Sequence, residues 1–285
     1  MKNRVFQAQR GFLTIAQNTD IDYLNLAYLQ AMSIKITMPQ SLYAVLVDRE
    51  TYKYITSKHK KVFDYIITID NDNSKNESWK LSNEWQAYYL SPFKETIKLE
   101  SDIIFTRDIY HWWNAFRLRD IVLSLNCQNY LQEQVIDTKY RQVFVENNLP
   151  NIYNGLMYFR YSQTSEQFFN YARIVFENWT EIQDTVLKKS YDINPTTDVV
   201  YAIVANILGP EQCTIPELDW INFVHMKPAI NNWPNKPWTE LVNFELDLPM
   251  IRINNINQYH PLHYHVKDWA SIDVIKEYEK CLNIS

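Results

Sequence analysis

Four apolar segments in the first third of the chain each end in polar or acidic side chains, and this pattern constrains the fold more than any other feature of the sequence. The segments cover residues 11–16, 42–47, 63–69 and 96–99, and they lead into Gln17 and Asn18, Asp48, Asp70, and Glu100 with Asp102. Apolar residues recur at helical spacing between some of these segments. Strands that alternate with helices predict an α/β fold, with a single mixed, mostly parallel central sheet flanked by helices. Ligands of such sheets bind at the carboxyl ends of the strands, where these polar residues collect.

The second half of the chain is less regular, but it contains two further strand patterns and two helical patterns. These cover residues 121–126 and 152–159 for the strands, and 165–187 and 198–208 for the helices. Asn154 and Gly155 fall inside the second of these strands. Glycine in a strand usually marks a bulge or a close approach of another group to the backbone, so this position is a candidate for function.

The fourth apolar segment ends in two carboxylates one residue apart. Residues 96–99 alternate polar and apolar with a period of two, which predicts a half-buried strand, and Glu100 and Asp102 follow directly. Burying an unpaired charge is costly, and hard oxygen ligands suit Mg²⁺ and Mn²⁺. The pair therefore indicates a divalent metal site and, with the metal, a phosphate-bearing ligand. A surface turn after a strand is the simpler alternative.

The scarcity of glycine excludes the common phosphate-binding loops. The chain has 3 glycines in 285 residues, whereas a dinucleotide fingerprint or a P-loop needs several glycines close together. Phosphate recognition must therefore use side chains and metal. The formal net charge of −5 gives no general basic field that would attract nucleic acid, so a nucleic-acid partner would need a local basic patch.

The cysteines and the N-terminal segment predict a cytoplasmic protein. The 3 cysteines are far apart and lack CxxC spacing, which indicates free thiols in a reducing compartment. The first ten residues contain no apolar region of a signal peptide. The longest weakly polar run, residues 199–208, is shorter than the roughly 18 apolar residues that span a bilayer.

Two histidine-containing segments near the C-terminal end carry lysines and are candidates for the same site as the carboxylates. His225 stands two positions before Lys227, and a cluster with His263 and His265 stands before Lys267. A metal held by Asp102 and a histidine, with a lysine beside it, would stabilise the charge that grows on a departing diphosphate. A mixed carboxylate and imidazole site favours Mn²⁺ over Mg²⁺. A packed or solvated loop is the alternative for this cluster.

These segments, in this order, resemble the type-A fold glycosyltransferases of the nucleotide-diphospho-sugar transferase superfamily, particularly their glycogenin-like and galactosyltransferase-like branch. Residues 99–102 are similar to the L-D-x-D metal motif of that family, with Glu100 in the place of the first aspartate. Asn154 and Gly155 resemble its N-x-G segment, although here the two residues are adjacent. Residues 225–228 and 263–269 are both similar to its late H-x-x-G-x-x-K-P-W element, and both lack the glycine.

The resemblance implies roles for individual residues. Asp198 would contact the donor sugar, with Asn154 and Gly155 beside the sugar and the acceptor. The implied metal ligands are Glu100, Asp102 and His265; His265 is favoured over His225 because Trp269 follows Lys267 by two positions, as in K-P-W. The implied donor-binding residues are Ala16, Gln17, Asn18, Asp48, Trp85, Glu100, Ser101, His225, Lys227 and Lys267. For Trp85, packing in the core is the alternative role.

The function that the resemblance implies is transfer of a sugar from a nucleotide sugar, a UDP-sugar, with Mn²⁺ or Mg²⁺ as cofactor. We expect a single domain over residues 1–285, with a nucleotide-sugar-binding half at 10–126 and an acceptor-binding half with a metal- and diphosphate-binding tail at 127–285. Retention of the anomeric configuration follows from the resemblance alone.

The acceptor is the least determined part of this prediction. A chain rich in Asn, Ile and Tyr is similar to phage-encoded sugar transferases, so the first hypothesis is a hydroxymethylated base in phage DNA. Basic residues that could contact phosphates occur in two local groups: Lys58, Lys60 and Lys61, and Arg107, Arg117 and Arg119. A glycan or a protein is the alternative acceptor.

Two rival functions share the same layout of strands and carboxylates. A nucleotidyltransferase would make the nucleotide sugar, but such enzymes carry a glycine-rich, basic loop after the first strand, and residues 16–20 have neither feature. A non-catalytic virion or carbohydrate-binding protein could keep the fold without the activity, and the glutamate at position 100 is compatible with that hypothesis.

Overall fold

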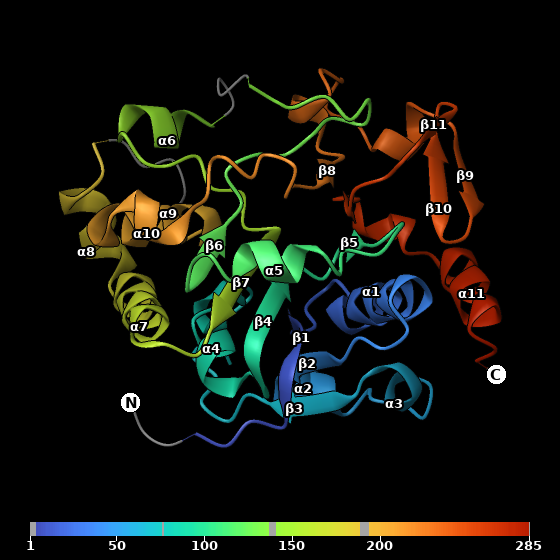
Figure 1. Ribbon diagram of the computed structural model, residues 1–285, viewed down its shortest axis with the longest axis horizontal. Coiled ribbons are helices and arrows are strands. Elements are labelled where there is room, and N and C mark those ends of the chain that lie inside the picture. Colours follow the sequence, from blue (N-terminus) through green and yellow to red (C-terminus); the bar gives the residue numbers. More distant parts are fainter. Residues whose placement is uncertain (1–3, 76, 137–140, 189–193, 285) are drawn as a thin grey trace.

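A six-stranded mixed sheet runs through the middle of the molecule and carries helices on both faces (Figure 1). The strand order in this computed structural model, which describes residues 4–75, 77–136, 141–188 and 194–284, is β3-β2-β1-β4-β7-β6. The strands are β1 (Ala8–Ala16), β2 (Tyr43–Val47), β3 (Tyr65–Thr68), β4 (Phe93–Leu99), β6 (Ile121–Leu123) and β7 (Leu156–Arg160). Strands β3, β2, β1 and β4 are parallel, and β7 runs antiparallel to both of its neighbours. The predicted mixed, mostly parallel sheet is confirmed.

The strand order reverses between β1 and β4. The chain passes from β1 to β2 and β3 on one side, and then returns to place β4 on the other side of β1. Such a reversal leaves a crevice at the carboxyl ends of the two strands, which is where α/β sheets bind their ligands. Glu100 and Gln17 stand directly after β4 and β1 at this point.

Helices cover the two faces of the sheet as separate layers. Helices α1, α5 and α11 pack on one face, and α4, α7 and α9 pack on the other. The helices are α1 (Tyr23–Thr37), α2 (Arg49–Tyr52), α3 (His59–Val62), α4 (Gln86–Leu90), α5 (Trp112–Phe116), α6 (Gln142–Glu146), α7 (Gln163–Glu177), α8 (Trp179–Thr185), α9 (Thr197–Leu208), α10 (Pro210–Cys213) and α11 (Ile272–Cys281), with 3₁₀ turns at Leu81–Asn83, Pro228–Ile230, Trp238–Glu240 and Lys267–Trp269. In the described part of the chain, none of them combines the length and the apolar character needed to cross a membrane.

Two small sheets complete the fold. Strand β12 (Leu262–His263) lies between β5 (Ile103–Ile104) and β8 (Val224–His225). A separate antiparallel sheet contains β9 (Phe244–Asp247), β10 (Met250–Ile253) and β11 (Ile256–Asn257). The first of these sheets joins the residues that follow Asp102 to segments more than a hundred positions later in the chain.

The prediction that β4 is half-buried was wrong. Ile97 and Leu99 face the core under α1, as their alternation predicted, but Lys98 on the opposite face is only 1% exposed. A central strand between two helical layers has no solvent face, so both sets of alternating side chains are buried. Lys98 is tolerated there because it forms a buried ion pair with Glu84.

Two element boundaries also differ from the predictions. Asn154 and Gly155 lie in a turn just before β7 rather than inside the strand. The helix predicted over 165–187 is broken between α7 and α8 at Asn178, whose φ of −121° and ψ of 31° interrupt the helical backbone. The Asn178 amide nitrogen Nδ2 donates to the Ile174 carbonyl at 2.8 Å, in addition to the backbone N–H of Asn178 at 3.1 Å, so Asn178 caps the end of α7 twice.

Gly11 in β1 offers a test of how tightly the sheet packs. A Cβ at this position would lie 2.6 Å from Cε1 and Cε2 of Phe93, whose ring is only 2% exposed. We therefore expect Gly11→Ala to lower the free energy of unfolding by about 1–3 kcal/mol, because the ring has little room to move. Thermal unfolding measures the change. Phe93→Leu made together with Gly11→Ala should cost less than the sum of the two single changes, and an unaltered melting temperature for Gly11→Ala would contradict this packing.

Candidate functional site

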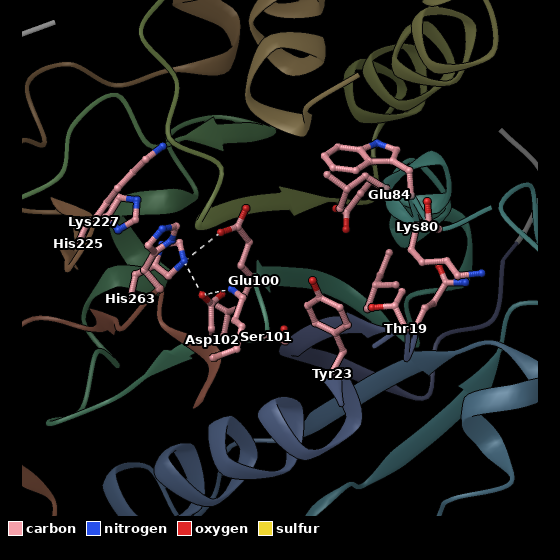
Figure 2. Close-up of a pocket in the computed structure, with 18 residues that line it drawn as sticks. Thr19, Tyr23, Lys80, Glu84, Glu100, Ser101, Asp102, His225, Lys227 and His263 are labelled. Carbon is pink, nitrogen blue, oxygen red and sulfur yellow. Dashed lines mark hydrogen bonds and ion pairs between the residues drawn. The ribbon is translucent and has the colours of Figure 1, made fainter. Parts of the chain in front are cut away.

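A cavity of about 360 Å³ opens at the carboxyl ends of β1 and β4, where the strand order reverses. Figure 2 shows its two walls, with Asp102, His225 and His263 on one side and Lys80 and Glu84 on the other. The cavity is lined by Ile15, Gln17, Thr19, Tyr23, Ser78, Trp79, Lys80, Leu81, Glu84, Leu99, Glu100, Ser101, Asp102, His225, Lys227, His263, His265 and Lys267. Polar groups that converge in a cleft at the carboxyl ends of the strands are the expected composition of a ligand site in an α/β fold.

Asp102 is the centre of charge in this cavity. It is 2% exposed, and its Oδ2 atom lies 2.9 Å from Nε2 of His263 and also accepts from Nζ of Lys267. Glu100 contributes from the neighbouring position, with its Oε2 3.3 Å from the same nitrogen of His263. Figure 2 marks the contacts of His263 with both carboxylates. The two carboxylates are close in the sequence, and the fold places two basic side chains, those of His263 and Lys267, beside them.

The small β5-β12-β8 sheet explains why the histidines lie beside Asp102. His263 of β12 pairs with Ile103 of β5 on one side and with His225 of β8 on the other. The two imidazole rings therefore stack, with centroids 4.2 Å apart and planes inclined by 7°. His265 follows two positions later and has a φ of 61°, a left-handed conformation that non-glycine residues seldom adopt.

The charges of this group shift one another's protonation. Burial alone would raise the pKa of Asp102, but His263 and Lys267 hold it well below its usual value. Burial would lower the pKa of His263, but Asp102 outweighs burial and raises it. The pKa of Glu100 is raised, first by burial. Asp102 is thus ionised and His263 holds its proton more tightly than a free histidine does.

The other two histidines are kept neutral. Burial lowers the pKa of His225 well below the usual value, and the neighbouring His263 lowers it further. Burial and the charge of His263 also lower the pKa of His265 to about 4. A neutral imidazole has a lone pair available for a metal ion, so both rings are in the form that coordination requires.

The chemistry of these donor groups fits a divalent metal ion. One oxygen of Asp102 and one nitrogen each of His263 and His265 lie within 4.8 Å of one another. The buried Nδ1 atoms of His225 and His263 have no hydrogen-bond partner among the described residues. Buried imidazole nitrogens without partners are uncommon, and carboxylate with imidazole suits Mn²⁺ and similar ions. The predicted pair of Asp102 and His265 is thus brought together, with His263 added, while Glu100 lies beside the group through its contact with His263.

The three residues expected to contact the sugar lie together next to Glu100. The backbone N–H of Glu100 donates to the Gly155 carbonyl at 3.0 Å. The backbone N–H of Asn154 donates to Oδ1 of Asp198 at 2.8 Å, and Oδ2 of Asp198 accepts from Arg141 at 2.7 Å. A Cβ on Gly155 would stand 2.8 Å from Cζ of Phe223, so only glycine fits this turn without displacement of the ring. Asp198 at the start of α9 therefore fixes the Asn154–Gly155 turn against the end of β4.

Three predicted donor-binding residues, Gln17, Asn18 and Asp48, are linked at the edge of the sheet, and of these only Gln17 lines the cavity. Nε2 of Gln17 donates to Asp48 at 3.2 Å, and Asp48 accepts from the backbone N–H of Thr51 at the start of α2. The backbone N–H of Asn18 donates to the Thr51 hydroxyl at 2.8 Å. Of the predicted donor-binding set, Gln17, Glu100, Ser101, His225, Lys227 and Lys267 line the cavity, and Ala16, Asn18, Asp48 and Trp85 lie outside its lining.

Trp85 points away from the cavity lining, toward the layer of helices that contains α7. Its ring packs against Tyr89 with centroids 5.7 Å apart, and the Arg173 guanidinium stands 5.7 Å from its centroid. These contacts match the alternative role in packing.

Ten residues of the cavity lining are absent from the predicted site residues, and Tyr23, Trp79, Lys80 and Glu84 are among them. Tyr23 opens α1 after β1, and the other three precede α4. Their position after a predicted strand or before a predicted helix was the only available signal, because no motif marks them. Glu84 in particular becomes interesting only when its partner Lys98 is known to be buried.

The overall fold has known counterparts. No family model matches the sequence, and no curated protein matches it. The galactosyltransferase LgtC, solved in complex with donor and acceptor sugar analogs, superposes with a TM-score of 0.54 at 10% identity, and the match covers 96% of this chain and 94% of that one. The chain has the type-A glycosyltransferase fold. The apo form of the glycosyltransferase GlyE of Streptococcus pneumoniae TIGR4 matches with a TM-score of 0.50 at 10% identity, over 96% of this chain and 62% of GlyE.

The protonation of His263 leads to a prediction for metal binding by this type-A fold. A metal that binds Nε2 of His263 must displace a proton held by Asp102, whereas His265 with its pKa of about 4 has no proton to lose near neutrality. We expect the affinity for Mn²⁺ to rise between about pH 6 and pH 8, with release of protons. Calorimetric titration of Mn²⁺ in two buffers of different ionisation enthalpy measures both quantities.

The control for this pH dependence is His263→Gln, which removes the titrating nitrogen and should flatten the profile. Without metal the sign is opposite for folding: a histidine whose folded-state pKa is raised stabilises the fold fully below about pH 6.5, and this contribution is lost as pH rises through the folded value. An affinity for Mn²⁺ that is the same at both ends of the pH range would contradict coordination by His263.

Proposed function

We propose that this protein is a metal-dependent glycosyltransferase that moves a sugar from a nucleotide sugar, a UDP-sugar, to an acceptor. The observation that carries the proposal is the buried Asp102 carboxylate, held by His263 and Lys267 in a cavity at the reversal of the strand order. The type-A glycosyltransferase fold supports it, as does the relation in fold to LgtC, whose structure contains analogs of a donor and an acceptor sugar.

In this proposal one wall of the cavity receives the diphosphate. Asp102 and His265 would hold Mn²⁺ (or Mg²⁺), with His263 as a further ligand and Glu100 assisting, and the ion would act as a Lewis acid for the departing diphosphate. Lys267, which pairs with Asp102, and the exposed Lys227 bring positive charge to the same wall. These lysines would bind the diphosphate oxygens and stabilise the negative charge that develops on them.

The Asn154–Gly155 turn and Asp198 would form the wall next to the sugar. Asp198 is oriented by Arg141 and by the backbone of Asn154, so its carboxylate is fixed before any ligand arrives. Each carboxylate oxygen accepts more than one hydrogen bond, and both therefore keep acceptor capacity for sugar hydroxyls. Preorganised groups of this kind cost no rearrangement during the reaction.

The contacts of the basic residues favour a saccharide or protein acceptor over hydroxymethylated DNA. Lys58 forms an ion pair with Glu279, and Arg117 forms one with Glu95. Nε of Arg119 donates to the Glu211 carbonyl. Side chains that are already paired neutralise fewer phosphates, and phosphate contacts normally dominate affinity for DNA.

The test of the proposed function is release of nucleoside diphosphate from a panel of nucleotide sugars, with and without Mn²⁺. We expect release from a UDP-sugar in the presence of metal, and a loss of about a hundredfold or more for Asp102→Asn, which keeps the size of the side chain but removes its charge. The matched control is Asp120→Asn, since Asp120 is also ion-paired, with Arg160, but lies outside the cavity lining. Full activity of Asp102→Asn at saturating Mn²⁺ would overturn the role of Asp102.

The same reactions identify the acceptor when they contain saccharides, a protein mixture or a hydroxymethylcytosine duplex and are followed by mass spectrometry. A mass gain on the saccharide or protein is the expected result. A gain on a nucleoside after digestion of the duplex would restore DNA as the acceptor. Binding of saccharides without release of nucleoside diphosphate from any donor would favour the non-catalytic carbohydrate-binding alternative.

A further inference from the structure

A buried ion pair lies on the wall of the cavity opposite Asp102. Oε2 of Glu84 pairs with Nζ of Lys98, whose side chain is 1% exposed, while the side chain of Glu84 is 10% exposed. Glu84 lines the cavity and Lys98 does not. Figure 2 shows Glu84 on the side away from Asp102 and His263. An ordinary surface glutamate is solvated, whereas this carboxylate is ion-paired on its buried side and faces a ligand cavity.

Lys98 explains how a carboxylate can persist at this depth. It projects from the centre of β4 to the face opposite Ile97 and Leu99, and it is the positive partner that compensates the charge of a Glu84 carboxylate away from bulk water. Lys98 forms its ion pair with Oε2, so Oε1 of Glu84 is available as an acceptor. A fixed oxygen of this kind accepts hydrogen bonds well from hydroxyl groups.

The surroundings of Glu84 connect it to the helix that carries Asp198. The hydroxyl of Tyr201 in α9 donates to the backbone carbonyl of Glu84 at 3.5 Å. Asp198 lies one turn earlier on the same helix, and its charge acts on Glu100. Glu84 is therefore a cavity residue that contacts the helix of Asp198, the residue proposed to contact the sugar.

We propose that Glu84, ion-paired with Lys98, accepts hydrogen bonds from the hydroxyl groups of the donor sugar. It thereby restricts the donor to neutral sugars and excludes uronic acids. This inference rests on the proposed function. A sugar hydroxyl would donate to Oε1 of Glu84, whereas the carboxylate of a glucuronosyl group would meet it with the same charge in a site of low dielectric. The Glu84–Lys98 pair would thus select neutral donor sugars by hydrogen bonding and disfavour uronic acids by repulsion.

The test compares the affinities of UDP, UDP-glucose, UDP-galactose, UDP-N-acetylglucosamine and UDP-glucuronic acid by calorimetry in the presence of Mn²⁺. We expect the protein to bind a neutral UDP-sugar more tightly than UDP-glucuronic acid. In Glu84→Gln the affinity for that neutral donor should fall about tenfold, because one charged hydrogen bond is lost. The discrimination against UDP-glucuronic acid should shrink by more than about tenfold, because the repulsion is lost as well. The affinity for UDP itself should stay within about threefold, because UDP has no transferred sugar.

Two further variants keep the test clear of effects on folding. Glu84→Gln leaves the charge of Lys98 unpaired, so the double variant Glu84→Gln/Lys98→Met removes both charges and should show the same loss of discrimination. Glu95→Gln is the matched control: Glu95 is also buried on β4 and ion-paired, with Arg117 at 2.8 Å, but lies outside the cavity lining, and its profile should equal that of the unmodified protein.

The outcomes separate this inference from the proposed function. An unmodified protein that binds no nucleotide sugar overturns both. Tight binding of UDP-sugars with unchanged discrimination in Glu84→Gln and in the double variant overturns only the role of Glu84. An equal fall in the affinities for UDP and for UDP-sugars would assign Glu84 to the nucleoside instead, which also contradicts the proposal.

Discussion

The burial of Asp102 is the constraint on which the rest of the site depends. A carboxylate that is 2% exposed at the end of a central strand needs positive partners, and the nearby sequence supplies none. Both partners come from far along the chain, since His263 and Lys267 lie 161 and 165 positions after Asp102. The C-terminal segment is therefore joined to the edge of the main sheet by charge, and the β5-β12-β8 sheet fixes the register of that contact. The need to compensate the charge of Asp102 therefore links the site to the topology of the chain.

The cavity that results has two chemically different walls. One wall concentrates imidazole, lysine and carboxylate around Asp102, and the other presents Glu84, backed by Lys98. Both walls meet at the carboxyl ends of β1 and β4, where the strand order reverses. A ligand with a charged portion and a portion rich in hydroxyl groups would be complementary to both walls. A nucleotide sugar has both portions, which is why the geometry and the fold support the same function.

The sequence predicted the parts of this structure that depend on local pattern. The apolar run of residues 42–47 and the alternation of residues 96–99 located β2 and β4, and the polar residues after each strand located the edge where the cavity lies. It could not predict the burial of Lys98, because a lysine in an alternating strand is normally solvated and its partner Glu84 lies in a separate segment. It favoured His265 on spacing alone, whereas the pairing of β12 with β5 also brings His263 to Asp102. Contacts between distant segments, such as these, are set by tertiary packing and leave no periodic signal in the chain.

The most direct measurement of the central claim is a crystal structure with UDP and Mn²⁺, in which an anomalous difference map identifies the metal. We expect one strong peak within coordination distance of Asp102 and of His263 or His265, with the diphosphate between this peak and Lys267. A peak that avoids Asp102, or a diphosphate bound outside the cavity at the ends of β1 and β4, would contradict it.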